Sequence, residues 1–146
     1  MAEAATDAPS VFVGSVRNAT ATAAAIDELL GAEASRVTIV ASDEHWSSVD
    51  PGRSGIRTAF EDVIGAGLIA AELAKRSRTL SVEARSAAGA AEAHRSTLAI
   101  SLADCIGGRE LIAKGFPDDV VLASELNATT IAVCRADDGF FEGWPT

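Results

Sequence analysis

Apolar residues recur at helical spacing along residues 57–73, and we expect the rest of the chain to be organised around this segment. If Phe60 faces inward, four further apolar or small residues fall on the same side, which is the pattern of an amphipathic helix. They are Val63, Ile64, Gly67 and Ala71. Gly65 and Gly67 leave a notch of small residues where another backbone or a ligand could approach closely. The pattern predicts one helix that continues to about Arg78.

The other apolar runs predict short strands that alternate with helices. Strands are expected at 11–16, 36–41 and 129–134, and an edge strand at 140–146 after a turn at 137–139. Helices are expected at 19–30, 81–94, 98–106, 109–114 and 120–126. Asn18 and Ser81 are placed to cap two of these helices. Glycines are placed to end three of them, at Gly31, Gly107–Gly108 and Gly115.

The first elements follow one another in the order strand, helix, strand. This order predicts parallel strands in a layered α/β fold, because a helical connection returns the chain to the same end of the sheet. We therefore expect residues 1–146 to form a single α/β domain with a small, mostly parallel sheet flanked by helices. The polar loop at 42–55 follows the second strand, where such folds commonly bind ligands.

Composition and charge exclude several classes of partner. The formal net charge of -9, from 21 acidic and 12 basic residues, disfavours nucleic acid and anionic membranes, because both need a basic face. No apolar run approaches the roughly 18 residues of a membrane span, and the acidic first residues lack the positive region of a signal peptide. Neither Cys105 and Cys134 nor His45 and His94 have the spacing of a metal site. We expect a cytoplasmic protein with reduced thiols.

Glu61 and Asp62 stand at the start of the central helix and have two interpretations. They could act in catalysis and bind a divalent metal. Alternatively, Thr58 and Glu61 form a capping box, and Asp62 adds a favourable charge near the positive helix end. Adjacent helical side chains point about 100° apart, so both carboxylates would reach one ion only at a frayed first turn. The sequence leaves both interpretations open.

A second group of candidates lies between the first strand and the first helix. This group comprises Gly14, Ser15, Arg17 and Asn18. A strand followed by Gly-Ser and a helix start presents free backbone N–H groups to an anion, and Arg17 could hold a phosphate through two hydrogen bonds. The same residues also fit an ordinary strand-to-helix turn with a solvated arginine.

Three segments in order resemble the 2-phosphosulfolactate phosphatases. Residues 11–19 resemble the hydrophobic-Gly-Ser-Leu-Arg-Asn-Ala segment of that family, and residues 60–67 resemble its Leu-Glu-Asp-x-Leu-Cys-Ala-Gly segment. Residues 108–120 resemble its Gly-Arg-x-Leu…Gly-x-x-x-Asp-Val segment, and residues 130–133 fit its closing strand. The matches cover nearly the whole chain.

The resemblance implies a magnesium-dependent phosphatase that releases phosphate from 2-phosphosulfolactate on the way to coenzyme M. It implies that Glu61 and Asp62 act in catalysis and hold Mg²⁺ in part. The phosphate of a small anionic substrate would be held by Gly14, Ser15, Arg17 and Asn18. For this chemistry the helix ends at Asn18 and Thr58 must open into one shared hollow.

Two departures from the family pattern lead to a second hypothesis. Family members are about twice as long, and this chain resembles their C-terminal half. In addition, Gly107 stands where many members have a histidine. A chain of this kind could be a non-catalytic remnant that acts as a binding or oligomerisation module. We expect a homo-oligomer, or a partner that covers the surface of the missing half.

Overall fold

The computed structural model describes residues 8, 10–31, 36–42, 44–46, 52–136 and 139–144. Four predicted features lie partly outside these residues: the start of the chain at 1–9, the polar loop at 42–55, the turn at 137–139 and the edge strand at 140–146. The helices are α1 (Ala19–Leu30), α2 (Phe60–Lys75), α3 (Val82–His94), α4 (Leu98–Asp104), α5 (Ile106–Ala113) and α6 (Pro117–Ala123), with short 3-10 turns η2 (Val16–Asn18) and η4 (Arg95–Thr97). The strands are β1 (Phe12–Val13), β2 (Glu44–His45), β3 (Ile56–Arg57), β4 (Val133–Arg135) and β5 (Phe141–Gly143).

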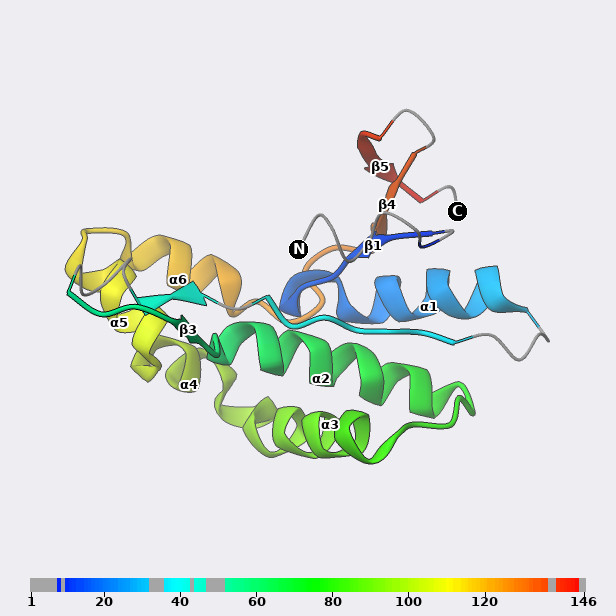
Figure 1. Ribbon diagram of the computed structural model, residues 1–146, viewed down its shortest axis with the longest axis horizontal. Helices are drawn as coiled ribbons and strands as arrows, with labels where there is room; N and C mark the ends of the chain where they lie inside the picture. Colours follow the sequence, from blue (N-terminus) through cyan, green and yellow to red (C-terminus); the bar gives the residue numbers. More distant parts are fainter. Residues whose placement is uncertain are drawn as a thin grey trace.

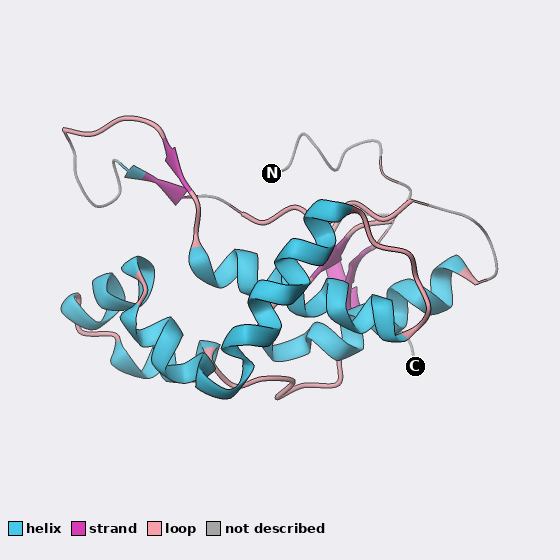
Figure 2. Ribbon diagram, turned by 90° about the horizontal axis from the view of Figure 1, so that it is seen from below, coloured by secondary structure: helices cyan, strands magenta, loops and turns pink. Residues whose placement is uncertain are grey.

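Helix α2 lies between α1 and α3 and supplies the centre of the core (Figure 1). Ile64 and Leu68 of this helix are fully buried, and apolar residues of α1 and α3 pack around them. The helix predicted from the apolar stripe is therefore confirmed. Helices α4, α5 and α6 gather beside the N-terminal end of α2, and the three-stranded sheet lies elsewhere, along α1 (Figure 1, Figure 2).

The notch predicted in α2 is confirmed, and two backbones fill it. A Cβ atom at Gly67 would lie 2.2 Å from the carbonyl oxygen of Ala87, so α3 packs directly against this glycine. A Cβ atom at Gly65 would lie 3.6 Å from the backbone nitrogen of Val16, and Ser15 is nearly as close. The turn that precedes α1 therefore rests on α2, one helical turn after Glu61.

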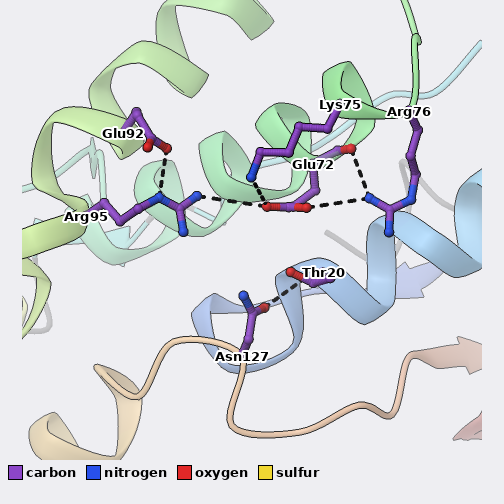
Figure 3. A network of polar contacts seen from close by, with 7 residues as sticks. All are labelled: Thr20, Glu72, Lys75, Arg76, Glu92, Arg95 and Asn127. Atoms are coloured by element: carbon purple, nitrogen blue, oxygen red, sulfur yellow. Dashed lines mark hydrogen bonds and ion pairs between the residues drawn. The ribbon is translucent and has the colours of Figure 1, made fainter.

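Glu72 joins α2 to the end of α3 through a group of charges (Figure 3). Its carboxylate accepts a hydrogen bond from Lys75 Nζ at 2.6 Å, while the guanidinium groups of Arg76 and Arg95 lie 3.5 and 3.9 Å away. Burial alone would raise the pKa of Glu72. The bond from Lys75 and the three positive charges outweigh that effect and lower the pKa below its ordinary value of 4.5.

The prediction of a mostly parallel sheet is wrong. Helices and strands do combine, but β1, β4 and β5 form a sheet in that order, and every pairing in it is antiparallel. β2 and β3 form a separate antiparallel pair. Residues 36–41, expected to supply the second parallel strand, form no strand, and Val37 and Val40 are exposed. In the absence of that strand, β1 pairs with β4. The connection between β4 and β5 is short, and a short connection can join only antiparallel strands.

Several helix boundaries agree with the sequence. The helix at 19–30 ends at Gly31, whose φ of 52° suits glycine. Ser81 caps α3 by accepting a hydrogen bond from the backbone N–H of Ala84 at 3.2 Å. None of the described helices is long and apolar enough to cross a lipid bilayer.

The predicted capping box is wrong. Helix α2 begins directly after Ala59, and no side chain caps it, so Thr58 and Glu61 do not exchange the expected hydrogen bonds. Glu61 therefore does not cap α2, and its carboxylate is directed to α5.

The predicted helix at 98–106 is divided in two. Helix α4 ends at Asp104, the backbone becomes extended at Cys105, and α5 begins at the next residue. Gly107 and Gly108 therefore begin a helix and do not close one. The break is tight, because a Cβ atom at Gly108 would lie only 1.9 Å from the carbonyl oxygen of Leu102.

Candidate active site

The carboxylate of Glu61 lies against the first turn of α5. A Cβ atom built at Gly107 would be 2.9 Å from Glu61 Oε1 and 3.4 Å from Oε2. Cys105 Sγ, at the start of the same helix, donates to Glu61 Oε2 at 3.7 Å. The two acceptor oxygens thus face an N-terminal helix turn, where a negative charge is favoured. A side chain larger than that of glycine at position 107 would contact this carboxylate directly.

Arg57 fixes the start of α2 to α5. Its guanidinium group is almost completely buried between two carboxylates, forming an ion pair with Glu44 of β2 and another, at 3.0 Å, with Glu110 of α5. Removing one partner of such a group leaves a buried charge without compensation. This anchor holds the first turns of α2 and α5 together and so positions Glu61 beside Gly107.

Cys105 is a capping residue that keeps its proton. Its sulfur accepts a hydrogen bond from the backbone N–H of Gly108 at 3.3 Å, and its thiol lies 3.1 Å from the carbonyl oxygen of Leu102. Burial raises the pKa of the Cys105 thiol, and the nearby charge of Glu61 raises it further. The single proton of this thiol can be donated either to the Leu102 carbonyl oxygen or to Glu61. A protonated thiol is a poor nucleophile at neutral pH.

An open pocket of about 420 Å³ borders this arrangement. Residues from α2, α3, α4 and α5 line it: Phe60, His94, Ile100, Ser101, Asp104, Cys105, Ile106 and Arg109. Ser101 Oγ lies 2.9 Å from His94 Nδ1, and the ring of Phe60 meets the imidazole edge-on at 5.2 Å between centroids. Cys105 lines the pocket and also contacts Glu61, so the carboxylate lies just behind the pocket wall.

The predicted phosphate-binding residues have other partners. Asn18 is buried and holds the turn together, because its side chain accepts from Ser15 N–H at 2.8 Å and donates to the carbonyl oxygen of Val13 at 3.1 Å. The guanidinium group of Arg17 pairs with Glu125 and donates to the carbonyl oxygen of Leu122 at 2.6 Å.

The two predicted groups of site residues therefore face different elements. The turn at 14–18 rests on α2, and a Cβ atom at Gly14 would lie 2.3 Å from the side chain of Ile69. Arg17 is directed to the end of α6, whereas Glu61 is directed to α5. Asn127, which follows α6, joins this segment to α1 by accepting a hydrogen bond from Thr20 N–H at 2.9 Å (Figure 3). The roles predicted for Gly14, Ser15, Arg17 and Asn18 remain predictions.

The residues that the structure describes fit part of a magnesium shell. Among them, no group of three or more His, Cys, Asp or Glu side chains could enclose a metal ion. Mg²⁺, however, is usually held by one or two carboxylates together with water and substrate phosphate. Glu61 offers such a carboxylate, and Asp62 follows it in the first turn of α2, half-buried. The protonated, soft thiol of Cys105 is not a ligand that Mg²⁺ prefers.

Comparison with known proteins identifies the family. A family model described as 2-phosphosulpholactate phosphatase matches residues 1–137. The chain belongs to the 2-phosphosulpholactate phosphatase family. No curated protein and no solved structure matches the chain. The resemblance predicted from three sequence segments is thus confirmed, and the family suggests a phosphatase of the 2-phosphosulpholactate type that acts on a small phosphorylated substrate.

The sequence analysis did not single out three residues of the pocket, Cys105, His94 and Arg109. Cys105 lies between α4 and α5, so helical spacing from Ser101 does not predict its place in the pocket. The position of His94 depends on how α3 turns into α4, which local spacing does not show.

Proposed function

We propose that this chain hydrolyses phosphomonoesters at the pocket between α2, α4 and α5, with magnesium as cofactor. The observation that carries the proposal is the Glu61 carboxylate, which faces the first turn of α5 beside the pocket. Family membership supports the reaction class. Glu61 or Asp62 would hold the metal in part. When bound, magnesium neutralises charge on the phosphoryl oxygens.

The side chains of the pocket suit the remaining steps. The guanidinium group of Arg109 can hold two phosphate oxygens, and the first turn of α5 adds backbone N–H groups. Water attacks phosphorus, the bond from phosphorus to the alcohol oxygen breaks, and that oxygen leaves with the electron pair. One proton of the attacking water passes to the imidazole of His94, which Ser101 orients at Nδ1, and from the imidazole to the leaving oxygen. The products are inorganic phosphate and the free alcohol.

Phosphate release from 2-phosphosulfolactate, with and without Mg²⁺, tests this proposal. We expect Glu61→Gln to lower the rate by about 100-fold or more, since it removes a carboxylate that would hold the metal beside the reacting group. Glu83→Gln is the matched control, because Glu83 stands in the first turn of α3 but is exposed and does not line the pocket. Equal rates for wild type and Glu61→Gln would contradict the proposal.

A second function, a binding or oligomerisation module without catalysis, is favoured by one observation. Large apolar side chains are exposed on several elements, among them Ile100, Val121 and Phe140, and exposed apolar surface often marks a protein interface. This hypothesis predicts a dimer or larger species in light scattering at micromolar concentration. A monomer at all concentrations would contradict it.

A further inference from the structure

Helices α5 and α6 form a hairpin at one end of the molecule and leave large apolar side chains exposed (Figure 1). Of residues 111–123, Val120 alone is buried. Helices of a globular protein usually turn apolar residues toward the core, and an exposed apolar surface of this kind is typical of a protein interface. We call this surface the α5–α6 face. Its large apolar side chains, which are 38% to 63% exposed, are Leu111, Ile112, Phe116, Val121 and Leu122.

The two halves of the α5–α6 face carry charges of opposite sign. Lys114 stands at the end of α5, whereas Asp118 and Asp119 stand in the first turn of α6. None of the three takes part in an ion pair with another residue that the structure describes. By contrast, Arg109 and Glu110 of α5 form ion pairs with other elements. One positive and two negative charges beside the apolar side chains are therefore available to a partner.

A second copy of the chain complements this arrangement of charges. A two-fold rotation about an axis through the turn between the helices, at Gly115 and Phe116, places the α5 half of one copy against the α6 half of the other. The basic half of each copy then faces the acidic half of its partner. Nucleic acid or an anionic membrane would need a continuous basic face, and Asp118 and Asp119 interrupt any such face here.

We propose that two copies of the chain form a symmetric dimer through the α5–α6 face. The apolar side chains of each copy cover those of the other, and Lys114 of each copy pairs with Asp118 and Asp119 of the other. None of the residues that form these contacts lines the pocket, so the dimer can form whether or not the chain is a phosphatase. Exclusion of water from the apolar side chains supplies the affinity, and the charges fix the two-fold orientation.

Sedimentation velocity over a range of protein concentrations tests the dimer. We expect wild type to show a reversible monomer–dimer equilibrium, and Val121→Asp to raise the Kd of the dimer by about 30-fold or more, because it places a charge within the apolar contact. Val82→Asp is the matched control, because Val82 lies on α3 and is 64% exposed, against 63% for Val121. A wild type that is monomeric at about 100 μM, or a dimer that Val121→Asp does not weaken, would overturn the inference.

Charge reversal tests the two-fold pairing itself. Lys114→Glu, and the double variant Asp118→Lys with Asp119→Lys, should each raise the Kd of the dimer by about 10-fold or more, because like charges then face one another in both contacts. An equimolar mixture of the two variants should form a heterodimer about as stable as the wild-type dimer, since each contact again joins unlike charges.

Sedimentation of fluorescently labelled Lys114→Glu detects the heterodimer. All three positions are exposed, so circular dichroism should show unchanged folding in both variants. Reversal variants that dimerise as tightly as wild type, or folded variants that fail to associate when mixed, would overturn the inference. If a reversal variant does not fold, the comparison of Val121→Asp with Val82→Asp decides.

Discussion

At the scale of single residues, Glu61 shows what local sequence can and cannot establish. A glutamate at the start of a helix can either cap that helix or belong to a functional site, and the sequence leaves both interpretations open. The structure decides against the cap, because α2 begins after Ala59 without a side-chain partner. Its contacts with Gly107 and Cys105 join residues more than 40 positions apart. Only tertiary packing brings these residues together.

Glu72 provides a test at the same scale. We expect Glu72→Gln to lower the free energy of unfolding by about 1 to 3 kcal/mol at pH 7, because it removes a charged acceptor from three cations. The folded-state pKa of Glu72 lies below 4.5. Its stabilising contribution is therefore complete above pH 4.5 and is lost as the pH falls through the folded pKa.

Urea denaturation at pH 7 and pH 3 measures the free energy of unfolding of each protein. The difference in this free energy between wild type and Glu72→Gln should be smaller at pH 3 than at pH 7. Glu92→Gln is the control, because Glu92 is exposed and, among the residues that the structure describes, pairs with Arg95 alone. Its effect should stay within about 0.5 kcal/mol. If this difference is absent at pH 7, or is the same at pH 3 as at pH 7, then the ion pairs of Glu72 do not stabilise the fold as described.

At the scale of elements, helices followed from the sequence better than strands did. The apolar stripe, the glycine stop at Gly31 and the cap at Ser81 are local signals, and each is confirmed. The segment at 36–41 has the composition of a strand, but a strand exists only if a neighbour pairs with it. The break at Cys105 was missed because its cause, the contact of Gly108 with Leu102, involves the packing of two helices.

Replacing two helical glycines by alanine should change the stability of the protein in opposite directions. Gly67→Ala should destabilise the protein by about 2 kcal/mol or more, since its Cβ would collide with the backbone of Ala87. Gly89→Ala should stabilise it by about 0.5 to 1 kcal/mol, because Gly89 lies within α3 and its Cβ would meet no atom within 4 Å. Thermal unfolding measures both changes, and a stable Gly67→Ala variant would rule out the close α2–α3 contact.

At the scale of the whole molecule, the order of strands and helices predicted the wrong sheet. The rule that places a helix between parallel strands needs two strands, and the second one did not form. The chain instead pairs β1 with β4, and β4 with β5, and both of these strands come from the far end of the sequence. The family, by contrast, was predicted correctly, because its segments keep their order and spacing whatever the strand pairing.

The central claim is that Glu61 and the first turn of α5 form the phosphoryl site. Amide NMR spectra recorded during titration with inorganic phosphate and Mg²⁺ test it most directly, because each candidate site has its own backbone N–H groups. We predict saturable shifts at Ile106, Gly107 and Arg109 that are lost in Glu61→Gln. Shifts confined to Ser15, Arg17 and neighbouring amides, or none at all, would contradict this account.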